Sequence, residues 1–108
     1  MTQVQTRQQV FARIGGRAAD IRRLGVHRLG LFGSFGRDEA TAGSDVDVLV
    51  HFHRGEKTYA NLFALSELLK EILDREVEVV TPESLPEAIR ERILQDVEYV
   101  EEAGRISR

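Results

Sequence analysis

The sequence predicts an α/β (α+β) fold in which a small mixed sheet of about three strands is flanked by helices. Two observations lead to this prediction. Segments with helical periodicity alternate with shorter strand patterns along the chain. Residues 45–52 also alternate as a strand with one apolar face does, because Val46, Val48, Val50 and Phe52 alternate with Asp45, Asp47, Leu49 and His51. At 108 residues the chain is expected to form a single domain over residues 1–108.

The N-terminal segment has helical periodicity. A helix is expected over residues 2–24, where Gly15 and Gly16 each weaken it by about 1 kcal/mol relative to alanine and favour a bend or a close contact. Gly25 is well placed to end this helix. The apolar residues that recur on one face of the expected helix are Phe11, Ile14, Ala18 and Ile21.

Two strands are expected in the middle of the chain. The first covers residues 26–32 and ends at Gly33-Ser34, and a loop or helical turn then covers residues 35–43. The second strand covers residues 45–52 and is the clearest of the chain.

The second half continues the alternation of helix and strand. Thr58 is expected to cap a helix over residues 59–73, and a third strand follows at residues 76–80. Pro86 suits the first turn of a last helix that Gly104 ends. The inward positions expected on these two helices are Leu62, Leu65, Leu69 and Ile72 on the first and Ile89, Ile93, Val97 and Val100 on the second. Tyr59 and Tyr99 are expected to pack with solvated hydroxyls.

Composition and charge exclude several classes of protein. The net charge is −3 and cysteine is absent, so we expect neither disulfides nor a thiolate metal site. A basic surplus would favour nucleic acid, and none is evident, so no direct binding to nucleic acid is expected. No apolar run approaches the length of a membrane span, and the first residues lack the pattern of a signal peptide. We therefore expect a cytoplasmic protein that does not contact membranes.

Asp45 and Asp47 are candidate metal ligands. Side chains two residues apart on a strand point to the same face, so both carboxylates are directed at one region. Two carboxylates that close repel each other, and a hard cation such as Mg²⁺, which prefers oxygen ligands and substrate phosphates, relieves the repulsion. The alternative is a solvent-facing edge strand that carries acidic residues and needs no metal.

Gly33 and Ser34 are candidate phosphate-binding residues. A strand that ends in Gly-Ser and turns into a helix places backbone N–H groups and a hydroxyl where a phosphate can bind. The alternative is an ordinary Gly-Ser turn. Ser44, directly before Asp45, is expected either to bond locally or to contact the nucleotide.

His51 and His53 are interpreted as a polar strand end and not as metal ligands. His51 lies about 20 Å along the strand from Asp45, too far to join that site.

Residues 33–50 read GSFGRDEATAGSDVDVLV, and this string resembles the signature of the nucleotidyltransferase superfamily, with its polymerase β-like fold. Arg37 and the run from Ser44 to Asp47 resemble most closely the minimal nucleotidyltransferases, the MNT family. The resemblance implies that Gly33, Ser34, Arg37 and Ser44 bind a nucleotide, with ATP as the expected substrate. It also implies that Asp45 and Asp47 hold two Mg²⁺ ions.

The resemblance implies a third catalytic and metal-binding carboxylate at Glu78, with Glu76 as the second choice. The family usually has aspartate at this position, and the alternative for Glu78 is a solvated strand residue. A second departure is Gly36-Arg37-Asp38, where the family tends to read Ala-Arg-Gly. Asp38 is expected to weaken triphosphate binding unless it pairs with Arg37.

An activity and a partner are also implied by the resemblance. The expected function is Mg²⁺-dependent transfer of AMP from ATP to a hydroxyl group of a HEPN-domain toxin. Tyrosine is the expected acceptor residue, and the chain is expected to be the antitoxin of this toxin. Because the chain is too short for the substrate domain of larger relatives, the acceptor is expected on that partner, in a hetero-oligomer. One alternative is a non-catalytic, nucleotide-binding antitoxin that neutralises the toxin by direct binding, and another is a subunit that senses nucleotide.

Overall fold

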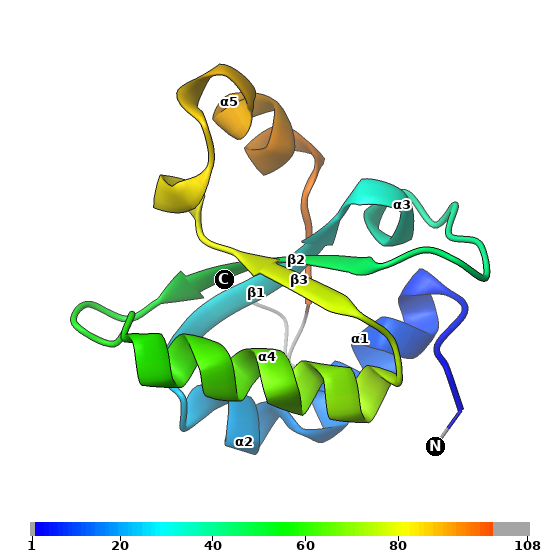
Figure 1. The fold of residues 1–108 in the computed structure, drawn as a ribbon, viewed down its shortest axis with the longest axis horizontal. Coiled ribbons are helices and arrows are strands. Elements are labelled where there is room, and N and C mark those ends of the chain that lie inside the picture. The colour runs from blue at the N-terminus through cyan, green and yellow to red at the C-terminus, as the bar shows by residue number, and fades with distance from the viewer. Residues whose placement is uncertain (1, 101–108) are drawn as a thin grey trace.

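The computed structural model describes residues 2–100 of the chain. Within that range no helix has the length and apolar character needed to cross a membrane. Helices and strands alternate as the sequence predicts (Figure 1). The elements in order are α1 (Arg7–Gly16), α2 (Ala18–Arg22), β1 (Val26–Phe32), α3 (Gly33–Gly36), β2 (Val46–Phe52), α4 (Tyr59–Leu73), β3 (Val77–Val80), the 3₁₀ turn η1 (Pro82–Ser84), α5 (Glu87–Asp96) and β4 (Glu98–Tyr99).

The four strands of residues 2–100 form one mixed sheet in the order β3-β2-β1-β4. β1 pairs antiparallel with β2 and with β4, and β2 pairs parallel with β3. Figure 1 shows α1, α2 and α4 on one side of the sheet and α5 on the other. The mixed sheet and its flanking helices confirm the predicted fold class, while the short strand β4 was not predicted.

The hydrophobic core lies between the sheet and the layer of α1, α2 and α4. The apolar face of β2, with Val46, Val48 and Val50, is fully buried there, as the alternation in residues 45–52 predicts. Leu65 and Leu69 of α4 pack against this face and are also fully buried. Of the inward positions expected on α4, Leu62 is only partly buried, whereas Leu73 at the helix end has no exposed surface.

The expected helix over residues 2–24 is divided, and it starts later than predicted. Thr6 caps α1 by accepting a hydrogen bond from the Gln9 amide, so the helix begins at Arg7. Val4 precedes the cap as a fully buried core residue, and its amide donates to the Leu73 carbonyl. α1 ends at Gly16, which places the predicted bend directly after the two glycines. Gly25, at φ +82°, follows α2 as the expected C-terminal glycine.

The prediction of a buried face on the last helix was wrong. No residue of α5 is buried, and Ile89 is 41% exposed. The helix ends at Asp96, because the chain then turns extended and pairs with the free edge of β1, where the Val100 amide donates to the Leu29 carbonyl. Gly104, the expected end of the helix, lies outside the described residues.

Tyr59 also differs from its expected packing role, because it is 88% exposed at the start of α4. Thr58 does cap α4 as predicted, by accepting from the Asn61 amide.

Candidate nucleotide and metal site

Asp47 lies between the end of β1 and the middle of β3. In the sheet register it pairs with Phe32, the last residue of β1, on one side and with Glu78 on the other. Paired residues on adjacent strands point to the same face, so the Asp47 and Glu78 side chains share the face opposite the core. The predicted juxtaposition of these two acids is therefore present.

Gly33 brings the turn after β1 against the Asp47 carboxylate. Its φ is +68°, and a Cβ atom added there would lie 2.2 Å from Asp47 Oδ2. Any larger residue would displace the carboxylate and strain the backbone. The Gly-Ser turn and the acidic strand therefore form one site.

The electrostatics of Asp47 show how closely the acids are placed. Burial, followed by the charge of Glu78, a side-chain hydrogen bond with Glu78 and the charge of Asp45, raises the pKa of Asp47 to about 6. Arg37 acts in the opposite direction and lowers this pKa. In the absence of a cation, Asp47 therefore retains a proton more readily than an isolated aspartate does.

The donor set fits Mg²⁺ held jointly by protein and substrate. In residues 2–100 no three acidic, histidine or cysteine side chains gather closely enough to form a metal cluster by themselves. Asp45 is exposed just before β2 and Glu78 is exposed on β3, with the half-buried Asp47 in electrostatic contact with both. Mg²⁺ is commonly bound by one or two carboxylates together with substrate phosphates. A pair of repelling carboxylates that opens to solvent suits such an ion.

The predicted nucleotide-binding residues lie in the turn after β1 and in the loop before β2. Ser34 lies half-buried in the four-residue α3, one position after Gly33. Arg37 is exposed directly after α3 and forms an ion pair with Glu39, with 3.1 Å between Nε and Oε1. Ser44 Oγ accepts a hydrogen bond from the Thr41 amide at 2.9 Å. The local role left open for Ser44 is therefore present, and its contact with the nucleotide stays a prediction.

Asp38 does not pair with Arg37. Its Oδ1 accepts a hydrogen bond from the Arg7 amide at 2.9 Å, which caps the first turn of α1. Its φ is +59°, a conformation in which glycine is least strained, and this matches the position where the resemblance expects glycine. Arg7 also donates from Nη1 to the Gly36 carbonyl at 2.9 Å. The Asp38 carboxylate therefore binds the start of α1. Residue spacing in the sequence does not predict this contact.

The far end of β2 carries a separate polar cluster. His51 Nε2 lies 2.8 Å from the Tyr99 hydroxyl, and the Arg28 guanidinium stacks 3.6 Å from the Tyr99 ring centroid. Burial and the nearby charge of Arg28 lower the pKa of His51. These contacts agree with the interpretation of this region as a polar strand end.

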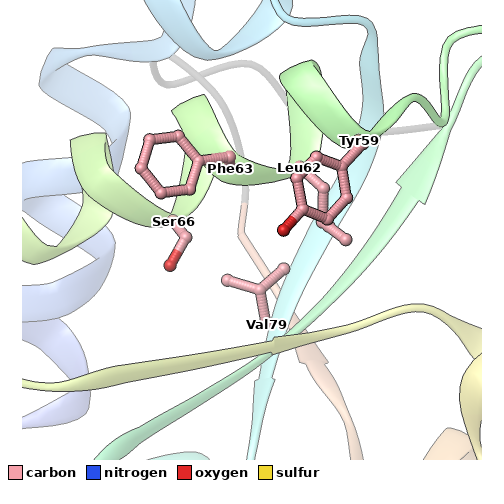
Figure 2. A pocket seen from close by; sticks show the side chains of 5 residues that line it. All are labelled: Tyr59, Leu62, Phe63, Ser66 and Val79. Atoms are coloured by element: carbon pink, nitrogen blue, oxygen red, sulfur yellow. The ribbon is translucent and has the colours of Figure 1, made fainter.

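A shallow pocket lies apart from the acids, between α4 and β3. Figure 2 shows its lining side chains around the space between the helix and the strand. Val79 contributes from β3, and because neighbouring residues on a strand alternate between faces, it points away from the face that carries Glu78. The α4 residues that line the pocket are Tyr59, Leu62, Phe63 and Ser66.

Known proteins are similar to this chain in sequence. The family described as nucleotidyltransferase domain matches residues 18–100. The protein adenylyltransferase MntA of Thermococcus cleftensis is 38% identical over 78 residues, covering 72% of this chain and 78% of that protein. A Methanocaldococcus jannaschii protein, provisionally named a protein adenylyltransferase, is 40% identical over 72 residues, covering 67% of this chain and 76% of its own.

Solved structures share the fold. A structure provisionally described as a minimal nucleotidyltransferase superposes with a TM-score of 0.76 at 30% identity, covering 86% of this chain and 94% of that one. A toxin–antitoxin structure with AMP-PNP superposes with a TM-score of 0.64 at 17% identity, covering 83% of this chain and 74% of that one. The second likeness is one of fold alone.

Proposed function

Because the chain belongs to the nucleotidyltransferase domain family, and within it to the minimal nucleotidyltransferases, we propose that it transfers AMP from ATP to a hydroxyl group of a partner protein. The observation that carries this proposal is the position of Asp47, held between Gly33 and Glu78 with its pKa raised to about 6. This arrangement joins a phosphate-binding turn to a pair of carboxylates that a cation would stabilise.

We assign roles to the residues from the family resemblance, and their positions support these roles. Asp45, Asp47 and Glu78 would hold two Mg²⁺ ions, which when bound neutralise the triphosphate and lower the pKa of the attacking hydroxyl. Gly33 and Ser34 offer a backbone N–H group and a hydroxyl to the β- and γ-phosphates.

Arg37 supplies positive charge beside the carboxylates, and Ser44 contacts the nucleotide from the loop before Asp45. Arg37 already acts electrostatically on Asp47, which supports its place in the site. Ser44 lies one residue before Asp45, and its hydroxyl accepts a hydrogen bond from the Thr41 amide within the same loop.

The reaction forms one bond and breaks one. The acceptor oxygen bonds to the α-phosphorus of ATP, the bond from that phosphorus to the bridging oxygen breaks, and pyrophosphate leaves. The proton of the acceptor hydroxyl goes to Glu78 or to solvent. Positioning and charge stabilisation contribute most of the rate in such a reaction.

The partner is a toxin, and the chain is its antitoxin. This part of the proposal is supported by two toxin–antitoxin structures of the same fold, one of which carries the name MntA, as the Thermococcus cleftensis relative does. We assign the partner to the HEPN class and the acceptor to a tyrosine hydroxyl, and we expect the two chains to form a hetero-oligomer.

The test is transfer of label from α-³²P-ATP to the co-purified partner in the presence of Mg²⁺. Wild-type chain is expected to label the partner, and Asp47→Asn is expected to bind the partner without labelling it. Glu71→Gln, a substitution of an exposed acid on α4 across the sheet, is the matched control and should label normally. A tight complex that carries no label with any nucleotide would support neutralisation by binding alone and would overturn the transferase proposal.

A further inference from the structure

Arg75 is the one charged side chain that is buried in the part of the chain that the structure describes, with 9% of its surface exposed. It lies in the turn between α4 and β3, directly after Asp74, which ends α4 in the left-handed conformation. Burying a guanidinium is costly unless its N–H groups are satisfied. The hydrogen bonds of the Arg75 guanidinium therefore show which segments it holds together.

The guanidinium of Arg75 joins two segments that lie far from it in sequence. Nε donates to the Val4 carbonyl at 2.7 Å, and Nη1 donates to the carbonyls of Ala42 and Ser44 at 3.0 and 2.8 Å. All three acceptors are backbone carbonyls. The arrangement ties the N-terminal segment to the loop that precedes Asp45.

These bonds fix the backbone of Asp45 from one side, and the neighbour of Arg75 fixes it from the other. Ser44, before Asp45, is held by the Arg75 side chain. Val46, after Asp45, donates its amide to the Glu76 carbonyl at 2.9 Å. Asp45 itself is exposed and lies outside the strand, so Arg75 and Glu76, two consecutive residues, anchor the backbone on either side of it.

Arg75 also contacts the other half of the site. Its guanidinium lies 5.1 Å from the ring centroid of Phe35, a fully buried residue of α3. Phe35 follows Ser34 directly, so the same side chain touches the turn proposed to bind phosphate and the loop that carries Asp45. Arg75 therefore contacts both segments at once.

We infer that Arg75 is a positioning residue for the nucleotide and metal site, acting through the loop at residues 41–44 and through Phe35. The expected loss of nucleotide affinity rests on the proposed function, whereas the expected effect of Arg75 on the loop at residues 41–44 does not. Lysine cannot replace Arg75, because a single ammonium on a flexible stem lacks the planar fork that reaches carbonyls in separate segments.

The test uses Arg75→Lys, which keeps the charge, and measures hydrogen exchange together with nucleotide binding. The amides of Ser44 and Val46 are expected to exchange at least about tenfold faster than in the wild type, while those within β1 and α4 are unchanged. The affinity for a non-hydrolysable ATP analogue with Mg²⁺, measured by calorimetry, is expected to fall about tenfold or more. Thermal unfolding of each variant shows whether the fold is kept.

Arg13→Lys is the matched control. Arg13 also donates to backbone carbonyls, those of Thr2 and Ile72, and so ties the N-terminal segment to the end of α4. It has no hydrogen bond to the loop at residues 41–44 among its described contacts. The control is expected to lower the melting temperature without changing either exchange at Ser44 and Val46 or nucleotide affinity.

Two outcomes would overturn the inference. One is an Arg75→Lys variant whose loop exchanges and binds like the wild type. The other is a uniform increase in exchange over all elements, which would assign Arg75 to general stability. If the wild-type chain itself bound no nucleotide, the proposed function would fail, while exchange at Ser44 and Val46 would still decide whether Arg75 positions the loop.

Discussion

The two faces of β2 have different environments at Asp47 although they share one backbone, while Leu49, farther along the face of Asp47, is fully buried. Val46, Val48 and Val50 have no exposed surface on the face toward α4, whereas Asp47 on the other face is half-buried beside Glu78. Packing of the valines fixes the strand, and the strand in turn holds Asp47 in a position that its own electrostatics disfavour. A site of repelling carboxylates can persist because the opposite face supplies the stabilising burial.

The largest effect on stability is expected when an acid is placed on the buried face of β2. Val48→Asp places a carboxylate in the core, and an unpaired buried charge costs several kcal/mol, against a total stability of about 5–15 kcal/mol for a typical domain. The variant should be unfolded by circular dichroism at neutral pH. Asp47→Val, the converse change on the other face, should remain folded. A folded Val48→Asp variant with the wild-type urea midpoint would contradict the assignment of the core face.

Glu78→Gln is expected to act on transfer and not on the fold. It removes a carboxylate from the site and the main charge that raises the pKa of Asp47. Transfer of AMP should fall by about 100-fold or more, while the melting temperature stays equal to that of the wild type or rises. Glu78→Asp, which restores the residue usual in the family, should retain transfer. Equal rates for all three proteins would show that Glu78 is a solvated strand residue, the alternative left by the sequence.

The smallest effect is expected from pH. In the metal-free chain the pKa of Asp47 is raised from 3.8 to about 6, so between these values the folded state binds more protons than the unfolded state. Stability from this group is therefore present below about pH 4 and is lost as pH rises through 6. Urea unfolding in EDTA should show this loss as a difference between the wild type and Asp47→Asn. Parallel pH profiles for the two proteins would contradict the raised pKa.

Much of the fold could be predicted where local patterns agree with tertiary packing. The bounds of β1 and α4 match the predicted ranges. Both segments have a clear pattern of apolar residues, and turn residues or an N-cap mark where they begin and end. The last helix was mispredicted because apolar residues at helical spacing do not reveal how far a helix stands from the core. Its C-terminal part instead satisfies the open edge of β1, a need that arises only after the sheet has formed.

Asp45 and Asp47 could be proposed together from the sequence, because spacing along a strand determines which side chains share a face, although β2 begins only at Val46. Gly33-Ser34 was proposed from a strand that ends in a Gly-Ser turn, and Glu78 was implied by the resemblance to the nucleotidyltransferases. What only the tertiary structure decided is the register that sets Asp47 opposite Glu78, and the anchoring of the loop before Asp45 by Arg75. Asp38 and Arg75 bond to backbone groups 31 or more residues away. Backbone carbonyls and amides are identical at every position, so no pattern in the sequence marks which of them a side chain will meet.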